Sequence, residues 1–300
     1  MSHLIALLVV SLVLGLLARR CGRFPEQTAL VLNAFILNVA VPALVLRVVH
    51  KVSLAPELLA AAATPWLVFG GSWLFFRTVG PRLGFAPDTV SALVLTSGLS
   101  NTAFVGLPLL EGLMGPKALE VAVVVDQLGS FLALATVATL FAARAAAKDT
   151  RPGVLLRKVL GFPPFLALVA ALLARPWEWP GWLDGVLGRL GELLTPLALF
   201  SVGYQLRLSG MKGRVRALAL GLGYKLVLAP VMVALVLLVL PGIGRLTFEV
   251  SVLQAAMAPM VTGAILAADH GLDPELSALL VGLGIPLSFA TVPCALWLMR

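Results

Sequence analysis

The chain has few of the residues that enzymes use for chemistry. Only 12% of its 300 residues are charged, and it holds three histidines and two cysteines. His3, His50 and His270 fall at expected helix ends and lack the spacing of metal ligands. Paired intramembrane aspartates, a Ser/His/Asp set, a phosphate-binding glycine loop and a prenyl-diphosphate metal cluster are also missing. The sequence therefore argues against an enzyme, and no cofactor or metal is expected.

Low charge is accompanied by a mean hydropathy of +1.03 and 60% hydrophobic residues, which places most of the chain in lipid. We expect a single membrane domain over 1–300. The apolar run Leu4–Ala18 precedes its basic residues, the reverse of a signal peptide, so a retained first helix is expected. Cys21 and Cys294 are expected near opposite faces, which argues against a disulfide between them.

Apolar stretches separated by charges or by glycine and proline turns predict ten membrane-spanning helices. Their expected bounds are 3–18, 27–48, 57–77, 88–111, 118–144, 158–174, 184–206, 215–240, 248–269 and 275–298. With the N-terminus outside, the inside segments hold 14 Lys and Arg residues and the outside segments hold 7, although the last inside loop holds none. Because basic residues favour the cytoplasmic side, both termini are expected outside a plasma (inner) membrane. The 144–158 connection would be cytoplasmic, and the net charge of +8 needs no nucleic-acid partner.

Five crossings reverse the direction of the chain, so two sets of five spans would be inverted relative to each other. Repeat one is expected over 1–145 and repeat two over 158–300. Several features recur in corresponding places: Pro42 and Pro196, Pro65 and Pro230, and Glu111 with Pro116 against Asp269 with Pro274. The sequence thus predicts an all-α polytopic membrane protein built from two inverted five-helix repeats. Unrelated proline kinks, which are common in membrane helices, are the alternative.

The fourth and ninth expected spans are interrupted at matching places. Ser97–Pro108 is apolar at both ends but polar and glycine-rich in its middle, and Gln254–Gly263 repeats this pattern 158 positions later. Paired interruptions of this kind indicate a transporter binding site, because unpaired backbone survives in a membrane only where protein or a water-filled cavity covers it. Since Pro259 falls opposite Asn101, the two broken helices are expected to cross near one point.

The interrupted segments offer groups suited to an anion. Glycine and proline weaken helical continuity and free backbone N–H groups, and the Asn101 amide could donate to a carboxylate. The candidate substrate-binding residues are Ser100, Asn101, Thr102, Gly106, Pro108, Pro259 and Thr262. Asn101 could instead join two helices, and Ser97 and Thr262 could bond within their own helices.

Two ionisable residues, Asp126 and Lys225, fall well inside expected spans. Buried charge is costly in a membrane and indicates function by default. Lys225 could reach the surface if its helix begins late, whereas the short side chain of Asp126 needs a partner, a bound cation or a proton. With Gln127 and Gln254 these residues are the candidates for charge balance or for coupling to protons or sodium. The sequence leaves open whether Asp126 and Lys225 pair.

The segments Leu37–Leu44, Ser100–Pro108 and Ala256–Pro259, with Pro196 and Pro230, resemble the auxin efflux carrier family over nearly the whole chain. This family belongs to the superfamily that includes bile-acid, arsenite and riboflavin transporters. The resemblance implies ten helices with the fourth and ninth broken and crossed. It also implies a dimeric scaffold, approximately 3–48 and 158–206, against which transport helices, approximately 57–144 and 215–298, move as an elevator.

The resemblance implies an organic anion substrate such as auxin, malate or malonate, held by Asn101 and the backbone around Pro259. The short connection after the fifth span favours a prokaryotic-type member, while Met260 stands where the family often has a second proline. We therefore expect a secondary active transporter of small organic anions, a homodimer surrounded by membrane lipid. A sodium-coupled symporter of the bile-acid type is the alternative; a passive channel, a sensor and an embedded enzyme are less favoured.

Overall fold

A computed structural model of the chain describes residues 2–51, 55–146, 160–205 and 213–300, with side chains from residue 6 onward. Within these ranges the chain is helical and no strand is formed. Most of the expected cytoplasmic connection, with Lys148, Arg151, Arg157 and Lys158, lies outside the described residues. The same holds for Arg207 and Lys212, two further basic residues used to predict the orientation.

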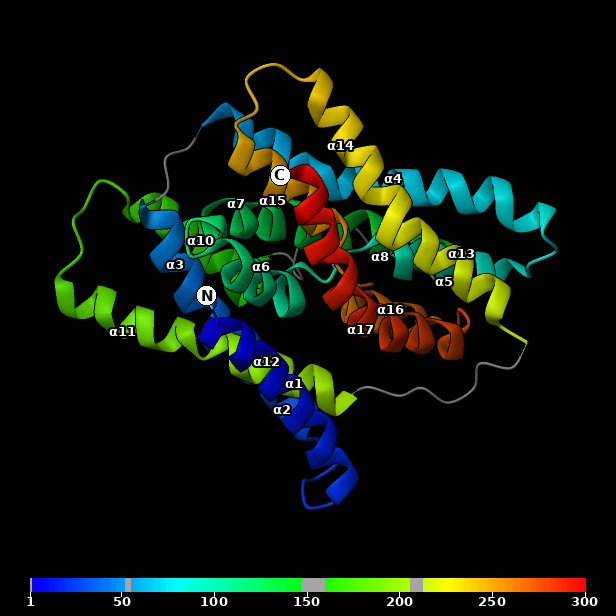
Figure 1. Cartoon of the computed structure of the whole chain (residues 1–300), viewed down its shortest axis with the longest axis horizontal. Helices are drawn as coiled ribbons and strands as arrows, with labels where there is room; N and C mark the ends of the chain where they lie inside the picture. The colour runs from blue at the N-terminus through cyan, green and yellow to red at the C-terminus, as the bar shows by residue number, and fades with distance from the viewer. Residues whose placement is uncertain (1, 52–54, 147–159, 206–212) are drawn as a thin grey trace. The chain divides into compact units, whose positions relative to one another are not determined.

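The elements follow one another along the chain, with η marking a π-helical segment (Figure 1). They are α1 (Ser2–Cys21), α2 (Thr28–Phe35), η1 (Ile36–Ala40), α3 (Val41–Lys51), α4 (Pro56–Arg82), α5 (Pro87–Gly98), η2 (Thr102–Gly106), α6 (Leu107–Met114), α7 (Ala118–Val124), η3 (Val125–Phe131), η4 (Leu134–Ala138), α8 (Thr139–Ala145), α10 (Pro163–Ala174), α11 (Gly181–Glu192), α12 (Leu194–Gln205), α13 (Val215–Gly223), η5 (Tyr224–Leu228), α14 (Ala229–Val239), α15 (Arg245–Ala255), α16 (Val261–Asp269) and α17 (Pro274–Met299).

Six helical rods within the described ranges are long and apolar enough to cross a membrane. They are Thr28–Lys51, Pro56–Arg82, Ala118–Ala145, Gly181–Gln205, Val215–Val239 and Pro274–Met299. Each lies within a few residues of an expected span, so the prediction of a polytopic helical membrane protein is confirmed. The expected ten-helix inverted repeat stays a prediction.

The expected start of the sixth span at residue 158 lies outside the described residues, and the described helix of this span is α10. Phe162 has extended backbone and α10 begins at Pro163. A proline fixes the φ angle that a first helical residue needs and lacks the N–H that would be unpaired there. It also disfavours helical backbone in the residue before it, so the Phe162-Pro163-Pro164 sequence starts a new helix.

The chain forms two compact units, each built from segments distant in sequence. Unit one comprises Met1–Leu54, Ala103–Val123 and Arg157–Leu206, and unit two comprises Ala55–Thr102, Val124–Leu156 and Arg207–Arg300. In unit one, α1 packs along α12 and α10 packs against α3. A Cβ atom at Gly15 would lie 2.0 Å from the Phe200 carbonyl oxygen, and one at Gly203 would lie 2.1 Å from that of Leu12. Glycine thus lets α1 and α12 meet backbone to backbone.

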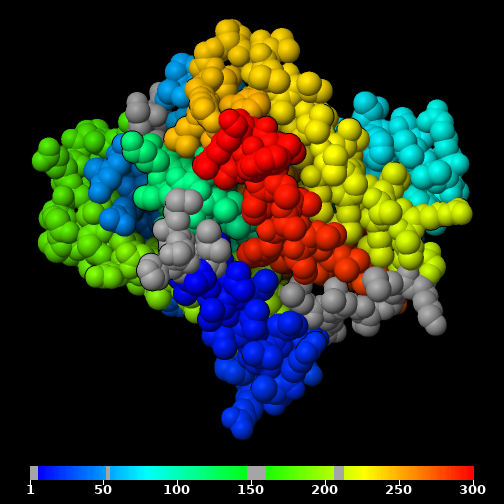
Figure 2. Space-filling model, in the orientation of Figure 1, coloured from blue at the N-terminus to red at the C-terminus, as the bar shows by residue number. Residues whose placement is uncertain are grey.

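Unit two packs α4 against α5 and η3, α14 against α15, and α17 against α13 and α5. Figure 2 shows α13–α14 in yellow and α17 in red lying side by side on one face of this unit. Large apolar side chains remain exposed on these helices, among them Leu235, Leu238, Val239, Trp297 and Leu298. Exposed apolar surface of this extent suits contact with lipid.

Candidate functional site

The first helix break lies in unit two between α5 and η2. Helix α5 ends at Gly98, and Leu99 has extended backbone with φ −116° and ψ 132°. Leu99, Ser100 and Asn101 therefore lie outside any helix before η2 begins at Thr102. A Cβ atom at Gly98 would lie 2.9 Å from the side chain of Ser72 on α4, so glycine permits the close approach of these helices just before the break.

The second break, also in unit two, separates α15 from α16. Helix α15 ends at Ala255 and α16 begins at Val261, after Met260 with φ −72° and ψ 127°. Pro259 has no backbone N–H and cannot continue the hydrogen bonding of α15. Its ring packs against α17 at Gly284, where a Cβ atom would lie 2.4 Å from Pro259 Cδ.

The two breaks meet and pair through their backbones. Ser100 and Pro259 form an isolated antiparallel bridge. Asn101 N donates to Ala258 O at 2.9 Å, and Met260 N donates to Leu99 O at 3.0 Å. These bonds satisfy groups that the broken helices leave free, which a membrane interior requires. The expected meeting of Asn101 and Pro259 is thus seen in the backbone geometry.

Lys225 connects the two breaks from η5. Its side chain is fully buried, and its Nζ donates to Ser100 Oγ at 2.5 Å and to Ala255 O at 2.6 Å. The alternative that Lys225 reaches the surface is therefore wrong. Both acceptors are neutral, and no described carboxylate forms an ion pair with it. A buried ammonium without a carboxylate partner favours a nearby anion.

Asp126 lies beside the same break, on η3. The residue is 4% exposed, and its carboxylate accepts hydrogen bonds from Thr102 Oγ1 at 2.5 Å and from Gln127 Nε2 at 2.7 Å. Asp126 and Lys225 do not form a direct ion pair. They bind residues of the same break that are two positions apart, Thr102 and Ser100. Both charges sit at the second position of a π-helical segment, a local irregularity that often marks functional sites.

Asn101 lies between these two anchored residues and has a free donor. The residue is 2% exposed, and its Nδ2 has no hydrogen-bond partner among the described atoms. Other buried side-chain atoms of unit two that lack one in the described part include Ser97 Oγ, Gln127 Oε1, Ser130 Oγ, Ser251 Oγ and Thr291 Oγ1. Leaving a buried polar atom unsatisfied costs about 1–3 kcal/mol, so the Asn101 amide is suited to a polar ligand.

The remaining candidate residues are less closely associated with the paired breaks. Gln254 is buried near the end of α15, whereas Thr262 is exposed in the first turn of α16. Gly106, at the end of η2, and Pro108, in α6, are buried residues of unit one. No group of three His, Cys, Asp or Glu residues within the described ranges could hold a metal ion.

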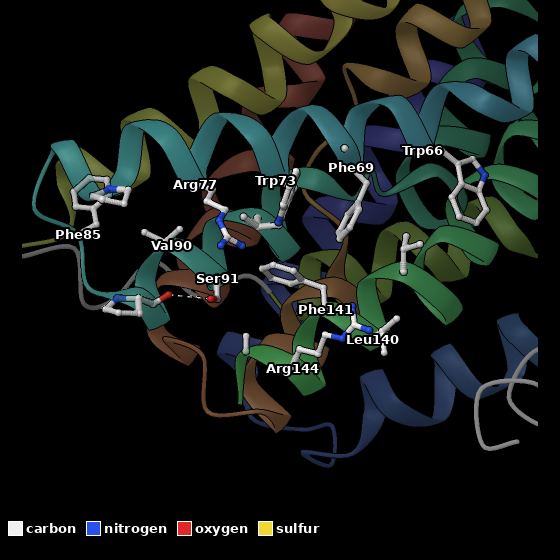
Figure 3. Close-up of a pocket in the computed structure, with 16 residues that line it drawn as sticks. Trp66, Phe69, Trp73, Arg77, Phe85, Val90, Ser91, Leu140, Phe141 and Arg144 are labelled. Carbon is white, nitrogen blue, oxygen red and sulfur yellow. Dashed lines mark hydrogen bonds between the residues drawn. The ribbon is translucent and has the colours of Figure 1, made fainter. Parts of the chain in front are cut away.

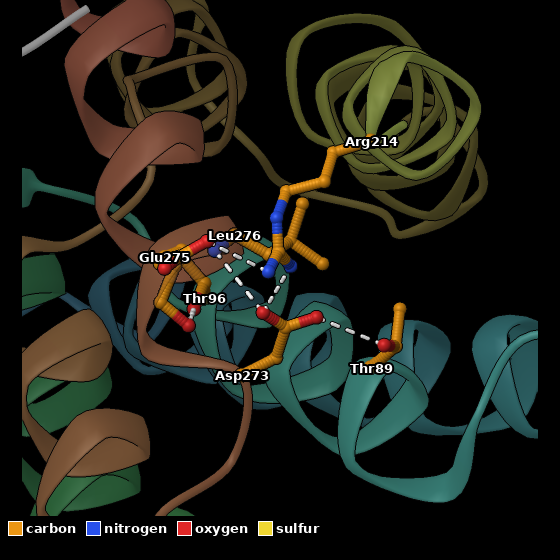
Figure 4. Close-up of polar contacts among 7 residues, drawn as sticks. Thr89, Thr96, Arg214, Asp273, Glu275 and Leu276 are labelled. Carbon is orange, nitrogen blue, oxygen red and sulfur yellow. Dashed lines mark hydrogen bonds and ion pairs between the residues drawn. The ribbon is translucent and has the colours of Figure 1, made fainter. Parts of the chain in front are cut away.

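A second polar cluster, not identified from the sequence, lies where α5, α13 and α17 begin (Figure 4). Arg214 pairs with Asp273 and, at 2.9 Å, with Glu275, while Thr89 Oγ1 donates to Asp273 Oδ2 at 2.9 Å. Asp273 has a left-handed backbone, with φ 39°, and its carboxylate also accepts the Leu276 N–H. An aspartate directly before Pro274 is a typical helix start; its bonds to Arg214 and Thr89 depend on packing that the sequence does not reveal.

Discontinuous helices that pair in the interior of a polytopic helical protein are an arrangement of membrane transporters. A family model described as "Membrane transport protein" matches residues 1–298, and the chain belongs to this family. It is therefore an integral membrane protein of a transporter family, and the family resemblance found in its motifs is confirmed.

Curated relatives align with almost the full chain. An "Uncharacterized transporter" of Methanothermobacter thermautotrophicus is 26% identical over 96% of this chain and 94% of its own length. A protein of Rhizobium meliloti named "Putative malonate transporter" is 27% identical over 96% of this chain and 92% of its own length. An uncharacterized transporter of Methanocaldococcus jannaschii is 24% identical over 98% of this chain and 96% of its own length.

Proposed function

We propose that this protein is a secondary active transporter of small organic anions that works by elevator-type alternating access. The observation that carries the proposal is the buried, unpartnered amide of Asn101 on a helix break that Lys225 holds. An amide donor and a nearby ammonium without a carboxylate partner together suit a carboxylate ligand. The name of the Rhizobium relative supports malonate-like dicarboxylates as the first substrates to test.

The substrate would bind against the first break and would be enclosed by the second. Ser100, Asn101 and Thr102 would present donors to the anion, and the Pro259 segment would form the opposite wall. Gly106 and Pro108 would shape the continuation of the fourth span, and Thr262 would be reached in another state of the transport cycle. Lys225 would balance the charge of the substrate. Gln254, near the end of α15, would be a further polar group for charge balance or coupling.

Asp126 would couple transport to a cation. Its carboxylate is buried, and two unpartnered oxygens, Gln127 Oε1 and Ser130 Oγ, belong to the same π-helical segment. A carboxylate with neutral oxygens suits either a proton or a hard cation. This observation also favours the second candidate function, a sodium-coupled symporter of the bile-acid type.

The packing of unit one supports two inverted repeats of five spans. The first span, α1, packs along the second part of the seventh, α12, while the sixth, α10, packs against the second part of the second, α3. Spans one and six are expected counterparts in the two halves, as are spans two and seven. The two contacts are therefore equivalent when the halves are exchanged. We propose the full ten-helix arrangement, repeats over 1–145 and 158–300, a homodimer formed by the scaffold helices, and both termini outside the plasma membrane.

Transport by purified protein in liposomes tests the proposal. We expect saturable uptake of labelled malonate or malate that is accelerated by the same unlabelled acid on the opposite side. Counter-exchange of this kind separates a carrier from a channel, which would give neither saturation nor acceleration. Repeating the assay with sodium, with potassium, and with a pH gradient separates sodium coupling from proton coupling.

The Asn101→Ala variant tests the site itself. We expect transport to fall by roughly tenfold or more, because a hydrogen bond to a charged group is worth about 1.5–3 kcal/mol. Asn38→Ala is the matched control, since Asn38 is exposed and donates to Ala34 O one helical turn earlier. Wild-type rates for every accepted acid in Asn101→Ala would remove the proposed site.

A further inference from the structure

A separate cavity lies between α4, α5 and α8 of unit two (Figure 3). Its volume is about 840 Å³, and apolar side chains form most of its wall. Trp66, Phe69 and Trp73 extend into it from α4, and Leu140 and Phe141 face them from α8. The ring of Phe69 meets that of Phe141 edge to face, with centroids 6.3 Å apart. Trp73 is 42% exposed, so the cavity opens to the surface.

Two arginines, Arg77 of α4 and Arg144 of α8, line the cavity. The Arg77 guanidinium lies over the ring of Trp73, 5.6 Å from its centroid. Neither arginine forms an ion pair with a described residue, and no carboxylate is among the residues that line the cavity. The wall therefore combines apolar and aromatic surface with two positive charges that lack a counter-charge.

Both arginines lie in the C-terminal part of their helices. The loop residue Phe85, which follows α4, and Pro87, which begins α5, line the same cavity as Ala145, the last residue of α8. The charged part of the cavity is thus at the ends of membrane helices, where headgroups lie. The distribution of basic residues predicts that this end is cytoplasmic, and basic pockets between helices on that side suit anionic lipid headgroups.

We propose that this cavity binds an anionic glycerophospholipid, with its phosphate between Arg77 and Arg144 and an acyl chain along the aromatic wall. A small soluble anion would be held by the arginines but would leave the tryptophan and phenylalanine surface uncovered. A zwitterionic lipid would cover the wall but would bring its own cation to the two arginines. This inference does not depend on which solute the protein transports.

Thermal unfolding of delipidated protein in detergent tests the proposal. Because a ligand stabilises the state that it binds, we expect dioleoyl-phosphatidylglycerol to raise the Tm by several degrees more than dioleoyl-phosphatidylcholine does. The Arg77→Gln/Arg144→Gln double variant loses this excess. Gly70→Phe loses it as well, because Gly70 lines the cavity and no atom lies within 4 Å of the place where its Cβ would stand, so the new ring fills the space.

The matched control is Arg82→Gln/Arg216→Gln, which removes the same charge from exposed positions of unit two outside the cavity. It should keep the full phosphatidylglycerol effect. The proposal is overturned by equal shifts with both lipids, by an equal loss in the control, or by a full shift with sn-glycerol 3-phosphate alone. The last outcome would assign the arginines to a soluble anion.

Tryptophan fluorescence of the unmodified chain gives a second test that does not depend on the folding of a variant. Trp66 and Trp73 line the cavity. Brominated phosphatidylglycerol should therefore quench the emission at lower concentration than brominated phosphatidylcholine. Trp73→Phe should reduce the amplitude of this preferential quenching, and identical quenching curves for the two lipids would count against the proposal.

Discussion

The two helix breaks occupy corresponding places in the chain but contribute different chemistry. The first supplies side chains: Ser100 accepts from Lys225, Thr102 donates to Asp126, and Asn101 keeps a free amide. The second, from Ala256 to Met260, has no polar side chain and supplies backbone groups instead. The carbonyl of Ala258 accepts from the first break, and that of Ala255, just before the second break, accepts from Lys225.

This difference shows how two similar interruptions can divide a site between them. The second break acts as a frame whose effect depends on backbone geometry and on the Pro259 ring. The first break holds groups that can distinguish one ligand from another. Substitutions of side chains should therefore matter most at the first break, and substitutions that alter the backbone should matter most at the second.

The largest effect is expected for Lys225→Met, because Lys225 contacts both breaks. The change leaves Ser100 Oγ and Ala255 O without their donor and removes the buried positive charge. We expect malonate uptake to fall by roughly 100-fold, equivalent to about 3 kcal/mol. Lys117→Met, at an exposed position, is the control and should transport normally. Comparable uptake by both variants would show that the breaks do not need the ammonium.

A smaller effect is expected for Gly284→Ala, which presses on the second break through the Pro259 ring. The new Cβ would lie 2.4 Å from Pro259 Cδ, so α17 and the Pro259 segment must move apart. Overpacking of this kind costs about 1–3 kcal/mol, seen as a lower Tm in detergent. Gly223→Ala is the control, since nothing lies within 4 Å of its Cβ position. An unchanged Tm in Gly284→Ala would mean that the second break is not a rigid frame.

Thr102→Val tests a single side chain of the first break. The variant keeps the shape of the threonine but loses the 2.5 Å hydrogen bond to Asp126. We expect transport to fall by roughly tenfold, corresponding to about 1.5 kcal/mol for a bond to a charged group. Thr102→Ser should restore most of the rate, and Thr78→Val, at an exposed position on α4, should have none of this effect. Failure of serine to rescue would indicate a role in packing instead.

The smallest effect is expected for Met260→Pro, which removes a backbone N–H of the second break together with a partly buried side chain. The φ of Met260, −72°, already suits proline. The variant nevertheless loses the N–H that donates to Leu99 O, at a cost of about 1 kcal/mol in unfolding free energy. Met260→Leu keeps the N–H and should match the wild-type Tm. A stabilised proline variant would show that this bond contributes nothing.

The positions of the breaks could be predicted because their causes are local. Pro259 cannot continue a helix in any context, and Gly98 with Asn101 weakens one wherever it occurs. The six long helices follow equally directly from runs of apolar residues. The offset of 158 residues then placed Asn101 opposite Pro259, and the bridge between Ser100 and Pro259 agrees with it.

The partners of the buried charges could not be predicted, because they depend on contacts between distant segments. Lys225 lies 125 residues from Ser100, and its position on a π-helical segment changes the direction in which the side chain points. Thr262 shows that closeness in sequence does not predict a place in the site either. It is close to the break in sequence, but it lies in the first turn of α16 at an exposed position. The contact of Gly284 with Pro259 could not be predicted either, because a glycine in an apolar helix can serve many structural purposes.

The glycine contact of α1 with α12 has a mechanical consequence. The Phe200 carbonyl oxygen of α12 lies 2.0 Å from the place where a β-carbon would stand at Gly15 of α1, and the Leu12 carbonyl oxygen of α1 lies 2.1 Å from the corresponding place at Gly203 of α12. Sliding or turning either helix by a single residue would drive the side chain of Leu14, Leu16 or a neighbour into main-chain atoms. The two helices should therefore move together as one rigid body. Any rearrangement of this protein during its working cycle has to leave the contact between α1 and α12 unchanged.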